Sequence, residues 1–319
     1  MKWGRLALLS LALPVFAAPA SAQSNYICFG DSITFGFGDD QTRPTAERGY
    51  PGRLDNVLAT RGVTATVVNE GLNGEATSEA VTRIEEVIAR ATAGSTLLLM
   101  EGTNDISVRT SIETIVFNLD AIADKAETAG LRVVFGTVVP RLSSANTDGN
   151  NRTAAQMSAL LRESARTANR TLADPFEVFF HQTQNFPSLF VGGTDRLHPN
   201  AAGYDKLAEV WADHLTSTDK VPPTVGEISP AQGSENVPAD TAIRVSIHDF
   251  GRGIDVANAR LTVNGADVPA TVTGTAQRVQ FDYRPADPLR GVVSVGFRAQ
   301  DTATPANTVT RTVSDFIIA

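Results

Sequence analysis

The chain of 319 residues contains 27 basic and 35 acidic residues and one cysteine, Cys28, so its formal charge at pH 7 is −8. An acidic surface repels nucleic acid and anionic membranes, and no basic run offsets it, so we expect neither as a partner. A lone thiol cannot form an intramolecular disulfide. Stability must therefore come from burial of a hydrophobic core, in which Cys28 acts as a small apolar side chain.

Residues 1–22 have the composition of an export signal. Lys2 and Arg5 precede an apolar stretch over 6–16, and the small residues at 20–22 predict cleavage between Ala22 and Gln23. The apolar stretch is shorter than the ~20 residues that a membrane-spanning helix needs. We therefore expect a secreted or periplasmic protein without a membrane anchor, whose mature chain carries 25 basic and 35 acidic residues, a formal charge of −10.

From residue 23 to 216, short apolar runs alternate with amphipathic helical patterns. The runs are almost continuously apolar, as in strands that are buried on both faces of a sheet. They occupy residues 26–29, 65–68, 96–100, 131–137 and 171–173. This alternation predicts an α/β domain with a parallel sheet between helices, and places its ligand site at the carboxyl ends of the strands.

Residues 217–222 form a short linker, and residues 223–319 follow a different pattern. Apolar and polar residues alternate there with a period of two, which is typical of half-buried strands. Asn264-Gly265 between two such runs is a strong hairpin signal. The expected strands are 243–247, 260–263, 279–283, 293–297 and 308–318. We therefore predict a second domain at 223–319, an all-β sandwich of the immunoglobulin-like kind.

Ser32 stands just after the first predicted strand. A serine at this edge of a parallel sheet can be presented to a cleft as a nucleophile, although a serine before a helix more often serves as its N-cap. Asp195 and His198 lie near the end of the same domain, three residues apart. In a turn this spacing lets the carboxylate orient one ring nitrogen, while the other takes a proton from serine. A surface histidine beside a capping turn explains the pair equally well.

Two further polar segments follow predicted strands and face the same edge as Ser32. Gly74 follows the second strand and Asn104 the third. A backbone N–H at Gly74 and the amide of Asn104 could together stabilise the oxyanion of acyl transfer, although each taken singly is an ordinary turn residue. Asp31 and Asp105 flank these positions, and we expect them to support the site by holding its loops.

Four blocks in this order resemble those of the SGNH hydrolases, also called GDSL-type esterases. They are Gly-Asp-Ser-Ile at 30–33, the glycine block around 74, Gly-Thr-Asn-Asp at 102–105 and Asp-x-x-His-Pro-Asn at 195–200. The resemblance covers about residues 25–216. It implies a flavodoxin-like three-layer α/β/α fold, with Ser32 as nucleophile and His198 as base. It also implies an oxyanion hole from the N–H groups of Ser32 and Gly74 and the side chain of Asn104.

The sequence thus predicts a secreted serine esterase that works through an acyl-enzyme and needs no metal or organic cofactor. We expect short acyl or acetyl esters, because no apolar segment suits a lipid lid, and the polar stretch 141–152 suggests a carbohydrate substrate. The alternatives are an exported polymer-binding or adhesion protein with an inactive hydrolase scaffold, or an acyltransferase. The second domain is expected to serve as a spacer or a polysaccharide contact. Its acidic stretch 248–255 is interpreted as a plain loop rather than a calcium site.

Overall fold

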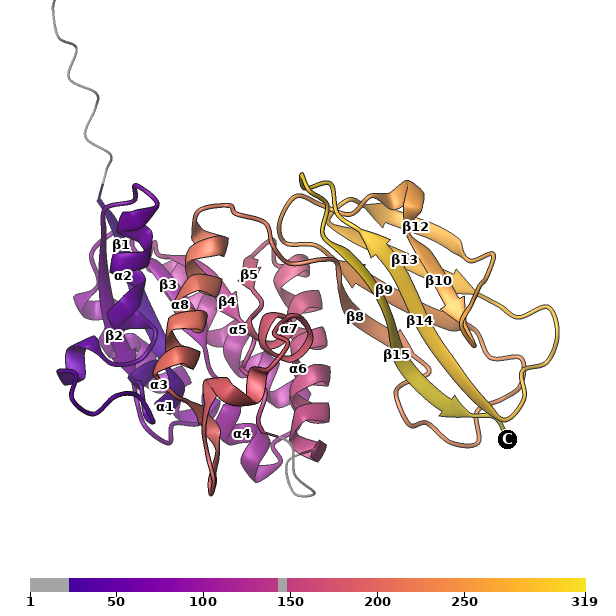
Figure 1. Cartoon of the computed structure of the whole chain (residues 1–319), viewed down its shortest axis with the longest axis horizontal. Coiled ribbons are helices and arrows are strands. Elements are labelled where there is room, and N and C mark those ends of the chain that lie inside the picture. The colour runs from indigo at the N-terminus through magenta and orange to yellow at the C-terminus, as the bar shows by residue number, and fades with distance from the viewer. Residues whose placement is uncertain (1–22, 143–147) are drawn as a thin grey trace, which may run out of the picture.

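In a computed structural model of the chain, residues 23–142 and 148–319 are described, and they form an α/β unit and a β-sheet unit (Figure 1). The α/β unit has a five-stranded sheet of order β2-β1-β3-β4-β5, and all its neighbouring strands are parallel. Its strands are β1 (Ser24–Gly30), β2 (Ala65–Gly71), β3 (Thr96–Met100), β4 (Arg132–Gly136) and β5 (Thr171–Ala173). This strand order is the flavodoxin-like one, so the predicted fold class is confirmed.

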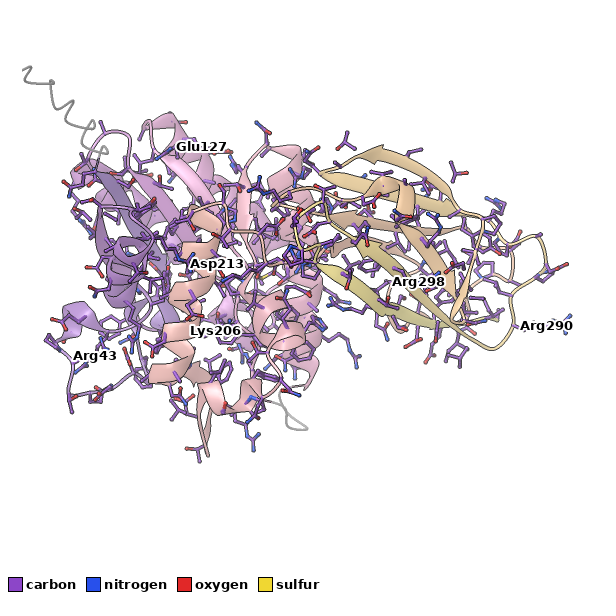
Figure 2. The ribbon with its side chains drawn as sticks, turned by 45° about the horizontal axis from the view of Figure 1, so that its top comes forward. Arg43, Glu127, Lys206, Asp213, Arg290 and Arg298 are labelled. Atoms are coloured by element: carbon purple, nitrogen blue, oxygen red, sulfur yellow. The ribbon has the colours of Figure 1, made fainter. Side chains whose placement is uncertain are left out.

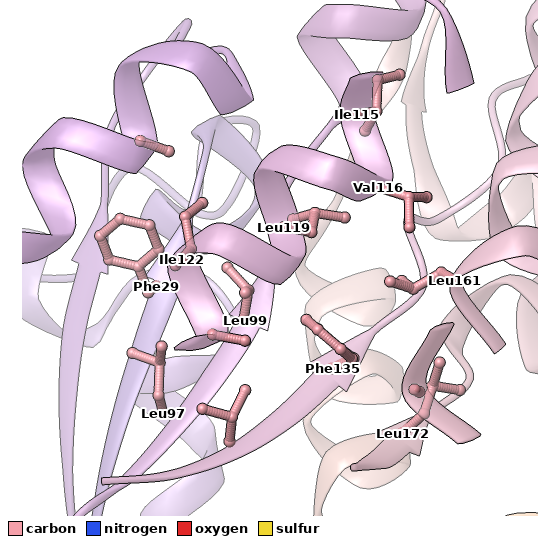
Figure 3. Close-up of a cluster of buried hydrophobic side chains, with 14 of the residues drawn as sticks. Phe29, Leu97, Leu99, Ile115, Val116, Leu119, Ile122, Phe135, Leu161 and Leu172 are labelled. Carbon is pink, nitrogen blue, oxygen red and sulfur yellow. The ribbon is translucent and has the colours of Figure 1, made fainter. Parts of the chain in front are cut away.

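Helices cover both faces of this sheet and bury a separate apolar cluster on each. Helices α3 (Thr77–Arg90), α5 (Ile112–Thr128) and α6 (Asp148–Thr167) cover one face. Figure 3 shows this cluster, in which side chains of α5 such as Leu119 and Ile122 face strand residues such as Leu99 and Phe135. Helices α2 (Pro51–Thr60) and α8 (Ala201–Leu215) cover the other face, where Trp211 is fully buried. No helix of the described residues is long and apolar enough to cross a membrane.

The strand order reverses beside β1, because β2 lies on one side of it and β3 on the other. The chain leaves β1 and β3 in opposite directions. In sheets of this kind the ligand crevice lies at the carboxyl ends of two such strands. Two short helices begin there, α1 (Ser32–Phe35) after β1 and α4 (Thr103–Val108) after β3. Figure 1 shows both helices at the same end of the sheet. The fold therefore brings Ser32 and Asn104 to one edge.

The second unit is a sandwich of two four-stranded antiparallel sheets, of order β11-β10-β14-β15 and β12-β13-β9-β8. The strands are β8 (Thr224–Ser229), β9 (Ile243–His248), β10 (Arg260–Val263), β11 (Ala266–Asp267), β12 (Thr271–Thr275), β13 (Arg278–Tyr283), β14 (Val292–Gln300) and β15 (Thr308–Ile317). The Asn264-Gly265 hairpin is confirmed, since both residues have positive φ and Val263 pairs with Ala266. Alternate residues of the two sheets fill one core between them.

Five strands lie where the sequence predicted none. Three of them are in the sandwich, where β8 pairs with β9, β11 pairs with β10 and the exposed edge strand β12 pairs with β13. Residues 195–199, expected to form a turn, are a short strand, β7 (Asp195–Pro199), which pairs antiparallel with β6 (Phe190–Gly192). The Asp195 side chain accepts from the backbone N–H groups of Leu197 and His198, and so it meets the His198 ring as it would in a turn.

The two units meet through charged side chains. Helix α6 faces β8, and Glu163 of this helix binds Arg278 of the sandwich at 3.0 Å. Glu177 of α7 (Pro175–Glu177) binds Arg311 of β15 at 2.6 Å. Figure 2 shows the two extremes of the molecule, with Arg43 on the α/β unit and Arg290 at the far end of the sandwich. The junction is therefore a polar contact rather than a shared hydrophobic core.

Candidate active site

Ser32 is the first residue of α1, directly after the strand-ending Gly30-Asp31. The Asp31 carboxylate, and not Ser32, caps the helix, because its Oδ1 accepts from the N–H of Ile33 at 2.8 Å. The Ser32 hydroxyl is therefore free for another partner. Gly30 is needed for this turn, since a Cβ there would lie 2.1 Å from the carbonyl oxygen of Met100 on β3. Ser32 is 6% exposed, so only a small part of it reaches the solvent.

His198 meets this hydroxyl from the β6–β7 hairpin. Its Nε2 lies 2.9 Å from Ser32 Oγ, and its Nδ1 lies 2.9 Å from Asp195 Oδ2. The N–H groups of Leu197 and His198 both donate to Asp195 Oδ1 at 3.0 Å. Burial opposes ionisation of Asp195, but these backbone donors and the imidazole outweigh it and lower its pKa below the ordinary value. The geometry thus holds an ionised carboxylate against one nitrogen of the imidazole and a hydroxyl against the other.

Two residues of the loop after α1, Phe37 and Gly38, position the imidazole of His198. Neither was assigned this role from the sequence. The ring of Phe37 packs 4.5 Å from that of His198 and is about half exposed. Gly38 has φ +87°, and a Cβ there would lie 2.9 Å from the Pro199 carbonyl oxygen and 3.0 Å from His198 Cβ. Only glycine permits both that backbone and that approach. In the sequence, Gly38 follows Phe35 and Phe37 and precedes Asp39. The glycine itself was the signal that could have identified this position.

Gly74, on the loop after β2, and Asn104, in the first turn of α4, lie on segments that are tied to each other. Asn104 Nδ2 donates to the carbonyl oxygen of Glu75 at 2.8 Å. The N–H of Leu72 donates to the Gly30 carbonyl at 2.8 Å, which anchors the loop of Gly74 to the end of β1. Gly74 has φ +79°, and nothing lies within 4 Å of a Cβ built there. The structure therefore places Gly74 and Asn104 on connected segments at the edge where Ser32 begins its helix.

Glu75, which was assigned no role from the sequence, anchors the loop that carries Gly74 to helix α3. Its buried carboxylate forms a bidentate ion pair with Arg83 of α3, with Arg83 Nε donating to Oε1 at 2.6 Å. Arg83 Nη1 also donates to the Glu70 carbonyl at 3.0 Å, and its guanidinium lies 3.9 Å above the ring of Phe29. A bidentate pair of this kind resists rotation as well as separation. The loop is therefore fixed to both β2 and α3.

Three buried carboxylic acids, Asp31, Glu101 and Asp105, lie at this edge of the sheet. Asp105 binds the N–H and the hydroxyl of Thr77, at 2.9 and 2.7 Å, and so joins α4 to the start of α3. Burial raises the pKa of Asp31 to about 6. Burial, with Asp31 and Glu75 nearby, raises the pKa of Glu101 well above its ordinary value. Glu101 was missed, although a glutamate directly after the apolar run 96–100 was a visible signal. We interpret these acids as structural, because none is in contact with Ser32 or His198 in the hydrogen bonds described.

The other residues considered from the sequence lie outside this group. Cys28 is buried, and burial raises the pKa of its thiol. His214 Nε2 lies 2.9 Å from Thr171 Oγ1 near the amino end of β5, and burial lowers its pKa to about 4. In the polar stretch 141–152, residues 143–147 lie outside the described part, whereas Asn151 binds the backbone N–H and carbonyl of Arg141. This asparagine therefore holds the loop rather than facing a cleft.

A cavity of about 850 Å³ lies away from Ser32, His198 and Asp195. Its lining comes from the amino ends of the strands, including Tyr26 and Thr96, and from the junction with the sandwich, including Asp219. The hydroxyl–imidazole–carboxylate group is the candidate active site, since it places a nucleophile, a base and an orienting carboxylate in contact, which a cavity alone does not. In the described residues, one group of three possible metal ligands occurs, and it lies at the sandwich junction.

The sequence profile of the GDSL-like Lipase/Acylhydrolase family matches residues 28–206, which is more than half of the chain. The chain belongs to this family. It is therefore a carboxylic ester hydrolase. No curated protein shows a significant match to the hydrolase.

Solved structures share its fold. The hydrolase is 24% identical to a member of the lipolytic protein G-D-S-L family from Veillonella parvula, covering 60% of this chain and 96% of that one, with a TM-score of 0.49. A catalytic mutant of an acetylxylan esterase from Geobacillus stearothermophilus is 20% identical, with 59% and 92% covered and a TM-score of 0.50. The lipase/acylhydrolase from Enterococcus faecalis is 19% identical, with 60% and 95% covered and a TM-score of 0.49. At these identities the likeness is one of fold.

Proposed function

We propose that Ser32, His198 and Asp195 form the catalytic triad of this ester hydrolase. His198 Nε2 takes the Ser32 proton as Oγ attacks the acyl carbonyl, and returns it to the departing alkoxide, which leaves as an alcohol. Water then attacks the acyl-enzyme with the same histidine as base, and the acid is released as Ser32 regains its proton. Asp195 keeps Nδ1 protonated and stabilises the imidazolium. The Ser32–His198–Asp195 chain of 2.9 Å contacts carries this proposal.

The oxyanion hole is assigned to the N–H groups of Ser32 and Gly74 and to Asn104 Nδ2. A primary amide has two N–H donors, and one of those on Asn104 is bound to the Glu75 carbonyl. That bond fixes the amide plane and leaves the second donor for the substrate oxygen. A donor that is held in place before the reaction stabilises the charge as it develops, without reorganisation. The Glu75–Arg83 pair serves this end by holding the loop.

The substrate is proposed to carry a short acyl group. Phe37 and Val191 are exposed apolar side chains close to His198 and Gly38, and they offer a small apolar surface for an acyl group. An acetylated carbohydrate fits this arrangement, and the acetylxylan esterase of similar fold is consistent with it. The export signal at 1–22 would deliver the enzyme to such a polymer outside the cytoplasm. The sandwich is proposed as a spacer or an attachment to that polymer.

The test is a series of 4-nitrophenyl esters from acetate to octanoate, beside acetylated xylan. We expect kcat/KM to be greatest for the short esters, and Ser32→Ala to remove nearly all turnover while the protein stays folded. The matched control is Ser78→Ala, an exposed serine on α3. Turnover by Ser32→Ala within a few-fold of the parent would refute the triad. A preference for octanoate would refute the short-acyl proposal and leave the triad intact.

A further inference from the structure

Three aspartates from distant parts of the chain meet at the junction of the two units. Asp219 lies between α8 and β8, Asp249 directly follows β9, and Asp301 directly follows β14. One carboxylate oxygen from each lies within 4.8 Å of the other two. Asp301 is 1% exposed, and Asp219 packs so closely on the next loop that a Cβ at Gly251 would lie 2.3 Å from its Cγ. The group is therefore built into the fold and not a chance meeting of surface side chains.

Asp249 provides a separate sign that a ligand belongs here. Its side chain is 3% exposed, and its Oδ1 accepts from the N–H groups of Gly251 and Gly253 at 2.7 and 2.9 Å. Its Oδ2 is buried and has no hydrogen-bond partner in the described part of the chain. A buried carboxylate oxygen without a partner is costly, and native structures seldom tolerate one. The N–H groups of Gly251 and Gly253 hold the Asp249 carboxylate by Oδ1. Its Oδ2 therefore remains available to the group of three aspartates.

The surrounding cations do not neutralise the three carboxylates. Across residues 23–142 and 148–319, no salt bridge involves any of them. Arg166 of α6 is nearby, but its Nη2 donates to the backbone carbonyl of Asp249, at 2.7 Å, rather than to the carboxylate. Asp219 Oδ2 is bound by the backbone N–H of Arg252, at 2.6 Å. Burial, with repulsion from the neighbouring carboxylates, raises the pKa of Asp249 to about 6 and raises that of Asp219.

We propose that Asp219, Asp249 and Asp301 bind a calcium ion at the junction between the hydrolase and the sandwich. Calcium prefers oxygen ligands at about 2.3–2.6 Å, so two ligands on opposite sides of it lie about 4.8 Å apart. The three oxygens lie within the span of the coordination shell of one such ion. Magnesium is the poorer fit, because it is usually held by one or two carboxylates and keeps several waters. Waters and backbone carbonyls complete the calcium shell.

The ion fastens the connection between the units. Asp219 belongs to the segment that joins them, while Asp249 and Asp301 end strands in opposite sheets of the sandwich. One ion therefore ties this segment to both sheets. Because Arg166 of α6 binds the Asp249 carbonyl, the same clamp reaches the α/β unit. The site lies away from Ser32, so it acts on stability and not on the ester chemistry.

The test uses the full chain, freed of metal with EDTA and desalted. Calorimetric titration with calcium chloride should show one equivalent bound, with Kd on the order of 0.1–1 mM or tighter. At about 5 mM calcium, a thermal scan should show a Tm higher by about 3 °C or more than in EDTA. Asp249→Asn should abolish both responses, because the amide keeps the Oδ1 acceptor for the two glycines and removes the charge. Turnover of 4-nitrophenyl acetate should be unchanged.

The matched control is Asp287→Asn, an exposed aspartate of the same sandwich, which should keep the full response to calcium. A purely structural aspartate would make Asp249→Asn less stable in EDTA. We expect the variant to be at least as stable as the parent there, because it relieves repulsion. No heat and no Tm shift in the parent, or the same shift in Asp249→Asn, would overturn the proposal. An equal response to magnesium would overturn the assignment to calcium. If Asp249→Asn does not fold, Asp301→Asn takes its place.

Discussion

Asp195 in the candidate active site and Asp249 at the junction of the two units show how differently the fold treats a carboxylate. Asp195 accepts from two backbone N–H groups and from the His198 ring, and these donors lower its pKa. Asp249 also accepts from two backbone N–H groups, but its second oxygen has no partner and two carboxylates lie beside it, and its pKa rises to about 6. The backbone donors are alike. Burial and two neighbouring carboxylates raise the pKa of Asp249, whereas for Asp195 the imidazole adds to the backbone donors and outweighs its burial.

The comparison teaches what each carboxylate is suited to do. A carboxylate that stays ionised against an imidazole can orient a base and stabilise its positive charge. A carboxylate held among others of its kind stays ionised cheaply only when a cation arrives. Asp195 is therefore suited to orient His198, and the junction aspartates are suited to bind a cation. The predictions below are ordered by the size of the expected effect.

The largest effects are expected at the active-site pair. His198→Ala should lower kcat by on the order of 10⁶ and Asp195→Ala by on the order of 10⁴, since the histidine transfers the proton and the aspartate only positions it. Steady-state kinetics with 4-nitrophenyl acetate measures both. Asp195→Asn separates the loss of the charge from the loss of the local fold, because its amide oxygen keeps the acceptor for the N–H groups of Leu197 and His198. Equal activity in Asp195→Ala and the parent would show that Asp195 has no part in catalysis.

Asn104→Ala should lower kcat by roughly 10²–10³ and change KM little, because its amide binds the oxyanion more strongly than the ground-state carbonyl. The measurement is again kcat and KM separately on one small ester. Asn118→Ala is the control, since Asn118 donates to Thr77 Oγ1 and lies on α5 behind the site. A rise in KM at constant kcat would mean that Asn104 serves binding and not the transition state.

A smaller effect is expected on stability at the junction. In EDTA, the raised pKa of Asp249 means that the folded state binds a proton which the unfolded state has lost between about pH 4 and about pH 6. The free energy of unfolding should therefore fall as pH rises through this interval, by roughly 1–3 kcal/mol from this group. Burial is the main cause of this shift, and the neighbouring carboxylates of Asp219 and Asp301 add to it.

Urea unfolding at several pH values, in EDTA and in calcium, measures this dependence. Asp249→Asn should lose that part of the slope, while the part from Asp31, whose pKa burial also raises to about 6, should remain. In calcium the parent should instead gain stability above pH 6, where the ion meets ionised carboxylates. An identical slope for the parent and Asp249→Asn would show that Asp249 is not the titrating group.

Much of the α/β unit could be predicted from the sequence, because its signals are local. Continuous apolar runs marked all five strands of the sheet, and positions 30–33, 102–105 and 195–198 lay at their ends or on a nearby loop. The edge strand β12 was missed because all five of its residues are exposed, which leaves no alternation to detect. β7 was read as a turn because it is short and irregular.

The contacts that support the site could not be predicted, because they join residues far apart in sequence. Gly38 meets His198 across 160 positions, and Asn104 reaches the Glu75 carbonyl across 29. The junction aspartates are separated by 30 and 52 positions, so a search for local calcium motifs found only the loop containing Asp249. Which oxygen of Asp249 lacks a partner depends on the folded backbone alone.

The most direct test of the central claim is labelling with a 4-nitrophenyl alkylphosphonate. Ser32 Oγ should displace nitrophenolate from phosphorus and retain the phosphonyl group, whose tetrahedral shape resembles the acyl-transfer transition state. We predict one phosphonyl group per chain on the peptide that contains Ser32, released nitrophenolate in equal amount, and no label in His198→Ala over the same time. Stoichiometric label on any other residue, or equal labelling of Ser32→Ala, would contradict the assignment of Ser32 as the nucleophile.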